Sequence, residues 1–128
     1  MLEQLIDVVG RAGLDILDVY GTAFDVKSKS DDSPLTEADL RAHRVIVDGL
    51  AAIDATIPVI SEESEAPSYS VRRTWRRYWL VDPLDGTREF VNRNGEFTVN
   101  IALIEDNEPV LGIVGAPARG DIYIGDVK

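Results

Sequence analysis

An apolar run that meets a proline between two acids constrains the fold of this chain more than any other stretch. Residues 78–81 are apolar or aromatic and predict a buried strand. We expect Asp82 and Pro83 to end that strand, because proline has no backbone N–H to donate and its ring fixes φ. Asp85 comes three residues after Asp82, across a turn that Pro83 stiffens and Gly86 permits. Both carboxylates are therefore expected to point into one small volume beyond the strand.

The carboxylates of Asp82 and Asp85 would repel each other in that volume unless a cation lay between them. Carboxylate oxygens, in a chain without cysteine, favour Mg²⁺ over zinc. Gly86 and Thr87 can begin a short helix, whose free N–H groups would face an anion held by the metal. The alternative is an ordinary turn, in which Asp85 or Thr87 caps the helix. The local sequence leaves both interpretations open.

Acids at two further places matter for the site, and those at the first place also follow a strand. The short apolar run at residues 58–60 predicts a strand, and Glu62 and Glu63 come just after it. The alternative for this pair is a solvated loop. Asp39 lies three residues after Thr36, which is the spacing of a capping box at a helix start. Its alternative role is that of a favourable charge in the first turn of that helix.

The rest of the chain predicts an α+β fold. Apolar residues at spacings of three and four predict helices over residues 2–20 and 36–53. The buried side of the second helix is expected to consist of Leu40, Ile46, Val47, Leu50 and Ile53. Strand patterns at residues 97–104, 110–114 and 122–124 predict an antiparallel meander. Two helices layered on a largely antiparallel sheet follow, and the last strand leaves an edge at which copies of the chain are expected to pair.

Composition limits the classes of function. With 128 residues and 45% hydrophobic content, the chain is expected to form a single domain over residues 1–128. A net charge of −10 argues against nucleic-acid binding, which relies on Lys and Arg. The absence of cysteine excludes disulfides and thiolate metal sites. No apolar run has the length of a transmembrane segment and the chain does not start like a signal peptide, so a cytoplasmic location is expected, with peripheral membrane association left open.

Two other features have ordinary explanations. His43, the only histidine, is expected in mid-helix at the surface or at an edge of the fold rather than as a metal ligand. A basic cluster is expected to be a solvated face, and it consists of Arg72, Arg73, Arg76 and Arg77. Attraction of an anionic substrate by these arginines is the alternative.

Together the acidic motifs resemble the inositol monophosphatase superfamily of Mg²⁺-dependent, lithium-sensitive phosphatases. Residues 79–87 match its W-x-x-D-P-x-D-G-T pattern throughout, and residues 62–64 match its upstream E-E-S element. The T-R-E-F sequence at residues 87–90 is similar to the CysQ-type 3′(2′),5′-bisphosphate nucleotidases. Further stretches that resemble this branch are residues 33–39, 78–79 and 93–104. The resemblance covers essentially the whole chain and implies the fold of the N-terminal part of such enzymes.

The resemblance also implies a role for each residue of the site. The metal ligands would be the carboxylates of Glu62, Asp82 and Asp85 and the backbone carbonyl of Leu84. The substrate contacts would be Glu62, Asp85, Gly86 and Thr87, with the phosphate at the last two. Asp39 and Thr87 would orient and activate the attacking water, because a threonine hydroxyl is a weak base alone but can relay a proton to a carboxylate.

The reaction that the resemblance implies is removal of the 3′-phosphate from adenosine 3′,5′-bisphosphate, giving AMP and phosphate in sulfur metabolism. Hydrolysis of inositol monophosphate is the alternative within the same class. Members of the family are longer and carry a further metal-binding aspartate in their second half. The chain is thus expected to be the N-terminal, metal-binding part of such a phosphatase, without that second half. The alternative for the chain by itself is a catalytically silent metal- or phosphate-binding fragment.

Overall fold

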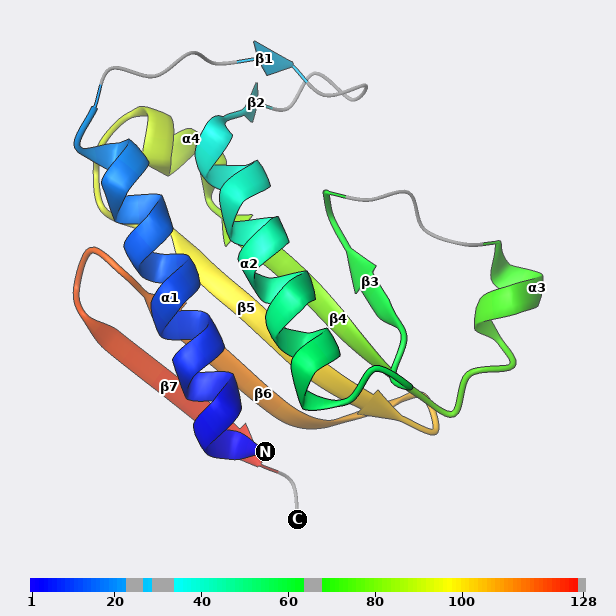
Figure 1. Cartoon of the computed structure of the whole chain (residues 1–128). Coiled ribbons are helices and arrows are strands. Elements are labelled where there is room, and N and C mark those ends of the chain that lie inside the picture. Colours follow the sequence, from blue (N-terminus) through cyan, green and yellow to red (C-terminus); the bar gives the residue numbers. More distant parts are fainter. Residues whose placement is uncertain (23–26, 29–33, 64–67, 127–128) are drawn as a thin grey trace.

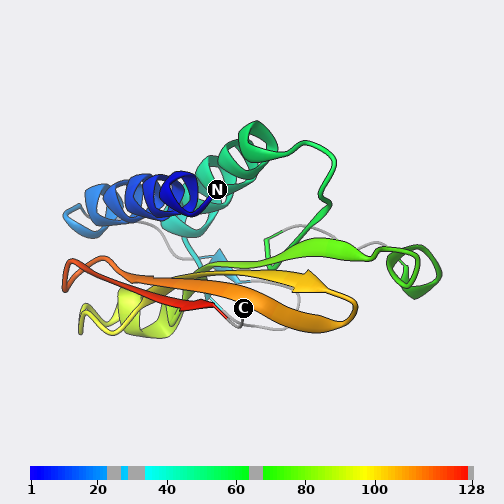
Figure 2. The same ribbon diagram turned by 90° about the horizontal axis from the view of Figure 1, so that it is seen from below.

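Two helices cover one face of a five-stranded sheet in the computed structural model, which describes residues 1–22, 27–28, 34–63 and 68–126. Helix α1 (Leu2–Tyr20) and helix α2 (Glu37–Ile53) lie side by side (Figure 1). Seen from below, both lie on the same side of the sheet (Figure 2). The predicted α+β architecture is therefore confirmed. Within the described residues, no helix has the length and apolar character needed to cross a membrane.

The two helices form where the apolar periodicity predicts them, and α1 has the predicted bounds. Its buried stripe consists of Leu5, Val8, Val9, Ala12, Gly13, Ile16 and Val19. The buried stripe of α2 consists of Ala38, Asp39, Ala42, Ile46, Gly49 and Leu50. The prediction that Leu40 is buried is wrong, because Leu40 lies about 200° around the helix from Ala38 and is 41% exposed.

Two glycines let α1 come close to its neighbours. A Cβ atom on Gly49 of α2 would lie 2.5 Å from Val8 Cγ2. A Cβ atom on Gly115, in the sheet, would lie 2.5 Å from Val9 Cγ1. Because such distances are far shorter than van der Waals contact, larger residues at these positions would push α1 away from α2 and from the sheet.

The sheet has the strand order β3-β4-β5-β6-β7. Its strands are β3 (Val59–Ser61), β4 (Arg77–Asp85), β5 (Thr98–Glu105), β6 (Glu108–Ala116) and β7 (Asp121–Asp126). Strands β5 to β7 form the predicted antiparallel meander, β4 extends it by a further antiparallel strand, and β3 pairs with β4 in parallel. The shorter elements are β1 (Lys27–Ser28), β2 (Pro34–Leu35), α3 (Tyr69–Arg72) and α4 (Thr87–Val91).

The end of β4 differs from the prediction, because the strand continues through Pro83 to Asp85. Asp82 pairs with Asn100 and Asp85 pairs with Thr98, so the two residues between the acids face a single residue of β5. This is the pattern of a β-bulge. A bulge residue has no ladder hydrogen bond to donate, which is why proline is tolerated there. Pro83 therefore bends the strand instead of ending it.

Helix α4 is fixed by contacts to the end of α1. The rings of Tyr20, Phe90 and Phe97 pack together with centroid separations of 5.1–5.2 Å. The Arg93 guanidinium lies 5.6 Å from the Tyr20 ring centroid. It donates hydrogen bonds to the backbone carbonyls of Tyr20 and Thr22, near the C-terminal end of α1. Favourable contact between a cation and this negative end of the helix dipole adds to the ring packing.

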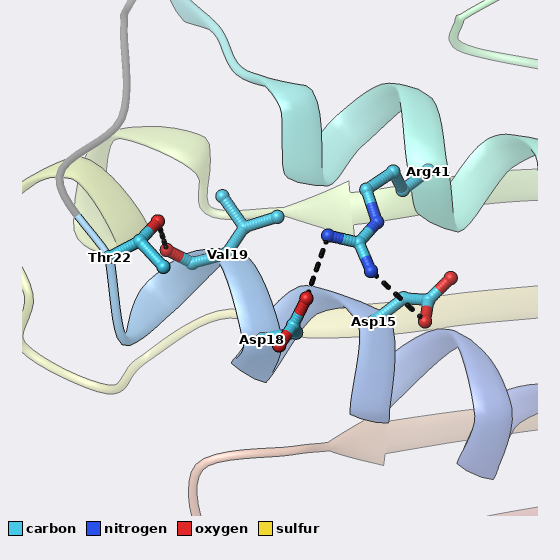
Figure 3. A network of polar contacts seen from close by, with 5 residues as sticks. All are labelled: Asp15, Asp18, Val19, Thr22 and Arg41. Carbon is cyan, nitrogen blue, oxygen red and sulfur yellow. Dashed lines mark hydrogen bonds and ion pairs between the residues drawn. The ribbon is translucent and has the colours of Figure 1, made fainter.

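One arginine links α2 to α1 on the opposite side from the sheet. Arg41 Nη1 lies 3.0 Å from Asp18 Oδ2, and Nη2 lies 3.4 Å from Asp15 Oδ1 (Figure 3). The hydrogen bond to Asp18 is the main cause that raises the pKa of Arg41. A raised pKa in the folded state contributes stability below the pKa of the unfolded chain, so this contribution is constant across neutral pH.

Replacing Arg41 with methionine is expected to lower the free energy of unfolding by about 0.5–1 kcal/mol, since the ion pairs are partly exposed. The measurement is urea unfolding at low and at high salt, and the loss should shrink at high salt because ions screen the pairs. Arg11→Met is the matched control, since Arg11 pairs with a residue of its own helix, at 3.0 Å from Asp7 Oδ2. An equal, salt-independent loss in both variants would contradict a linking role for Arg41.

Strand β7 is an edge strand, and all six of its residues are exposed. Its apolar side chains are Ile122, Tyr123 and Ile124, which are 40%, 56% and 44% exposed. Pairing of this edge between copies of the chain stays a prediction. Light scattering should show a mass that increases with protein concentration, and Tyr123→Lys should shift it towards the monomer. A monomer at every concentration would contradict the expectation.

Candidate active site at the bulged end of the sheet

The bulge in β4 places the two acids of the central motif on the same face of the sheet. In a regular strand, residues three apart point to opposite faces, but one extra residue restores the same side. The burial pattern agrees, because Val81 and Leu84 are buried under the helices whereas Asp82 is half-buried and Asp85 is exposed. Asp82 and Asp85 therefore belong to the face opposite α1 and α2.

Glu62 joins this face from the neighbouring strand. Ser61 pairs with Val81, and the Glu62 N–H donates to the Val81 carbonyl at 3.2 Å, so Glu62 comes just beyond the pair and beside Asp82. Asn100 lies opposite Asp82 on the other side. A groove of about 310 Å³ is lined by Glu62, Asp82 and Asn100 together with apolar residues of β4, β5 and β6. Glu62 and Asp82 thus line the same groove on this face of the sheet.

A sharp turn follows Asp85. Gly86 has φ of +88°, and a Cβ atom there would lie 2.9 Å from the Glu96 carbonyl oxygen, so the position requires glycine. Helix α4 begins at Thr87. The Thr87 hydroxyl lies 3.2 Å from the Leu84 carbonyl oxygen. This carbonyl, expected as a metal ligand, therefore lies beside the bulged acids and the start of α4.

Thr87 is linked to a carboxylate that lies wholly inside the protein. Its Oγ1 donates to Asp39 Oδ1 at 3.0 Å, and Asp39 has no exposed surface. The other oxygen, Oδ2, accepts hydrogen bonds from the backbone N–H and the hydroxyl of Thr36, at 2.8 and 2.7 Å. The predicted capping box is present. Asp39 thus caps α2 and contacts Thr87 at the same time. A role at the helix start is therefore compatible with the role beside Thr87 that the resemblance implies.

The donor set of the predicted metal site is chemically suited to Mg²⁺. Its groups are the carboxylates of Glu62, Asp82 and Asp85 and the carbonyl of Leu84, all hard oxygen donors. Glu62 and Asp85 are exposed, so an ion could reach them without unfolding the sheet. Within the described ranges, however, no three acidic, histidine or cysteine side chains already form a metal-binding cluster. Convergence of the three acids on one ion therefore stays a prediction.

His43 makes a contact that the sequence did not suggest. Its Nδ1 lies 2.8 Å from Ser61 Oγ, and the ring is half-buried rather than at the surface. The Glu63 N–H donates to the same Ser61 Oγ at 3.3 Å. The sequence did contain one indication of this position, since His43 follows Asp39 by four residues and therefore lies on the same side of α2. His43 therefore contacts the turn that carries Glu62.

The basic cluster is partly neutralised by neighbouring acids. Arg77 Nε lies 2.9 Å from Glu105 Oε1, and Arg76 Nε lies 3.4 Å from Asp106 Oδ1. These pairs join the start of β4 to the end of β5, at the opposite end of β4 from Asp85. The positions of Arg76 and Arg77 favour the interpretation as a solvated face over a role in attracting substrate.

The comparison with protein families decides which class of protein has this arrangement. A model described as the inositol monophosphatase family matches residues 1–127. The chain belongs to the inositol monophosphatase family. The 3′(2′),5′-bisphosphate nucleotidase CysQ of Escherichia coli strain K12 is 54% identical over 125 residues, which are 96% of this chain and 50% of that protein. The chain thus spans about half the length of the curated relatives it matches.

Solved structures confirm the fold. CysQ from Bacteroides thetaiotaomicron, a bacterial member of the inositol monophosphatase family, superposes with a TM-score of 0.81 at 45% sequence identity. The match covers 97% of this chain and 45% of that one. An IMPase/NADP phosphatase complexed with Mg²⁺ and phosphate superposes with a TM-score of 0.82 over 98% of this chain and 48% of that one, and at 16% identity it shows the fold alone.

Proposed function

We propose that the chain forms the metal- and phosphate-binding part of a Mg²⁺-dependent phosphatase that converts adenosine 3′,5′-bisphosphate into AMP and phosphate. The observation that carries the reaction type is the hydrogen bond from Thr87 to the buried Asp39, beside a row of oxygen donors on one face of the sheet. The name of the Escherichia coli relatives, 3′(2′),5′-bisphosphate nucleotidase, supports the substrate. We also propose that residues 1–128 form a single domain, the N-terminal part of that phosphatase.

The proposed metal ligands are the carboxylates of Glu62, Asp82 and Asp85 and the carbonyl of Leu84. Bound Mg²⁺ supplies positive charge to the phosphate oxygens and makes water more acidic. Without an ion, acids brought to one face of the sheet repel one another, so the exposed Glu62 and Asp85 side chains are expected to turn outward.

In this proposal, Thr87 and Asp39 move a proton away from the attacking water. The Thr87 hydroxyl donates its hydrogen to Asp39, so a lone pair on Oγ1 can accept a hydrogen bond from water. As the water oxygen bonds to phosphorus, the water proton passes to Oγ1 and the threonine proton passes to Asp39. The bond between phosphorus and the 3′-oxygen breaks with its electron pair on the 3′-oxygen, which takes a proton from solvent water to give the 3′-hydroxyl of AMP. The hydrogen bonds from Thr36 hold the carboxylate in place for this transfer.

Gly86 and Thr87 are the proposed phosphate contacts, and Glu62 and Asp85 are proposed to contact the rest of the substrate. Helix α4 has only five residues, so its dipole adds little. The phosphate would instead meet the individual N–H groups of the turn, whose shape depends on the positive φ of Gly86.

The substrate is tested by comparing phosphate release from adenosine 3′,5′-bisphosphate and from inositol 1-phosphate, with Mg²⁺, in a protein of the relatives' length that contains this chain. We expect the larger kcat/KM with the nucleotide. A larger value with inositol 1-phosphate would replace the nucleotidase by an inositol monophosphatase. No Mg²⁺-dependent release from either compound would reject the proposed phosphatase.

A second candidate is that residues 1–128 alone are a catalytically silent metal- or phosphate-binding fragment. The observation that favours it is the length of the relatives, of which the chain matches about half. Mg²⁺ keeps its water shell when few protein oxygens compete, so weak binding and little phosphate release are expected from the 128-residue chain. Turnover equal to that of the longer protein would exclude this candidate.

A further inference from the structure

Helix α2 contacts both of the strand ends that carry acids. Asp39, in its first turn, accepts the hydrogen bond from Thr87 that follows the end of β4. His43 lies one helical turn further on the same side and contacts Ser61, the last residue of β3. The two polar side chains of one rigid helix therefore contact the two turns on which the proposed site is built.

The turn after β3 is held from two directions. The Glu62 N–H donates to the Val81 carbonyl at 3.2 Å, which ties the backbone to β4. Ser61 is only 4% exposed, and its Oγ contacts both His43 Nδ1 at 2.8 Å and the Glu63 N–H at 3.3 Å. The Ser61 hydroxyl thus connects α2 to the backbone on the far side of Glu62.

We propose that His43 is a positioning residue for Glu62, acting through Ser61. This inference rests on the proposed function, in which Glu62 is a metal ligand. Glu62 itself is exposed and follows the last residue of a three-residue strand, so its own packing does little to fix it. Fixing Ser61 and the Glu63 amide from α2 reduces the freedom of the residue between them. A carboxylate held near its bound position loses less entropy when it binds an ion.

Two substitutions at His43 separate a hydrogen-bonding role from a packing role. His43→Asn keeps a polar atom close to the place of Nδ1, whereas His43→Leu keeps an apolar side chain of intermediate size without that atom. Arg44→Ala is the matched control, because Arg44 is the exposed neighbour on the same helix. Ser61→Ala removes the same contact from the other side and serves if His43→Leu does not fold. Glu62→Gln marks the loss of the ligand itself.

The readouts are the dissociation constant for Mn²⁺, measured by electron paramagnetic resonance, and the hydrogen exchange of the Glu62 and Glu63 amides. Loss of a group that hydrogen-bonds a metal ligand weakens metal binding about 10–100-fold. Because His43 acts on Glu62 through Ser61 and not directly, we expect the lower end of that range, about a tenfold weaker affinity, in His43→Leu. Exchange of both amides should also become faster. His43→Asn should stay close to the original protein in both measurements, as should Arg44→Ala.

The outcomes separate the positioning role of His43 from the proposed role of Glu62 as a metal ligand. If Glu62→Gln weakens Mn²⁺ binding but folded His43→Leu and Ser61→Ala do not, His43 has no positioning role. Faster amide exchange with unchanged Mn²⁺ affinity would reduce the contact to a structural one and overturn the inference as well. If Glu62→Gln itself leaves Mn²⁺ affinity unchanged, the proposed metal site is wrong, and the inference fails with it.

Discussion

Replacing Asp82 with asparagine is expected to lower phosphate release by more than about 100-fold in a protein of the relatives' length. Losing a group that only supports a ligand costs 10–100-fold, and a direct ligand should cost more. Asparagine keeps the shape of the side chain, and Asp82 is half-buried on the open face of the sheet, which is the face opposite α1 and α2. The free energy of unfolding should therefore change by less than about 0.5 kcal/mol. The measurements are steady-state phosphate release and urea unfolding.

Asp48→Asn is the control for Asp82→Asn, since it makes the same change of charge at an exposed position of α2. It should keep the activity of the original protein. Near-normal turnover of Asp82→Asn at saturating Mg²⁺ would show that Asp82 is not a metal ligand. A large loss of stability would instead assign the residue a structural role at the bulge.

Replacing Thr87 with alanine is expected to lower kcat by about 10²–10⁴-fold, the range attributed to general acid–base catalysis. The reason is that alanine removes the hydrogen bond through which a proton could pass from the substrate side of the turn to the buried Asp39. Thr87→Ser keeps the hydroxyl and should retain most of kcat. The measurement is kcat together with the Mg²⁺ dependence of the rate, which should change little in either variant.

Thr87→Ala is a sharper test than a substitution at Asp39. Asp39 also accepts two hydrogen bonds from Thr36, and leaving these buried donors without an acceptor would cost about 1–3 kcal/mol of stability. A lower rate in Asp39→Ala would therefore mix lost stability with lost catalysis. If Thr87→Ala and Thr87→Ser had the same kcat, the proton transfer through Thr87 would be wrong.

The sequence predicted those features that depend on neighbouring residues. Both helices follow from apolar spacing, and the capping box at Thr36 and Asp39 follows from a three-residue interval. The hairpins of the meander follow from turn residues between apolar runs. In each case the interaction joins residues within one element or across one short connection, so a local pattern is sufficient to predict it.

Features that depend on pairing between distant segments could not be predicted in this way. Pro83 has the sequence signature of a strand end, and only the register with β5 reveals a bulge that keeps Asp82 and Asp85 on one face. The parallel pairing of β3 with β4 depends on where the chain returns to the sheet. The contact between His43 and Ser61 spans 18 positions and joins a helix to a strand. The spacing of four residues places His43 on the same side of α2 as Asp39, but it does not reveal Ser61 as the partner.

The most direct test of the account is to locate a bound ion in crystals of a protein that contains this chain, using the anomalous scattering of Mn²⁺ in place of Mg²⁺. The account predicts a peak on the open face at the bulged end of the sheet, with oxygens of Glu62, Asp82, Asp85 and Leu84 at about 2.0–2.6 Å from it. A peak elsewhere, or carboxylates that stay more than about 10 Å apart with the ion present, would contradict the proposed metal site, because direct metal–oxygen bonds cannot span that distance.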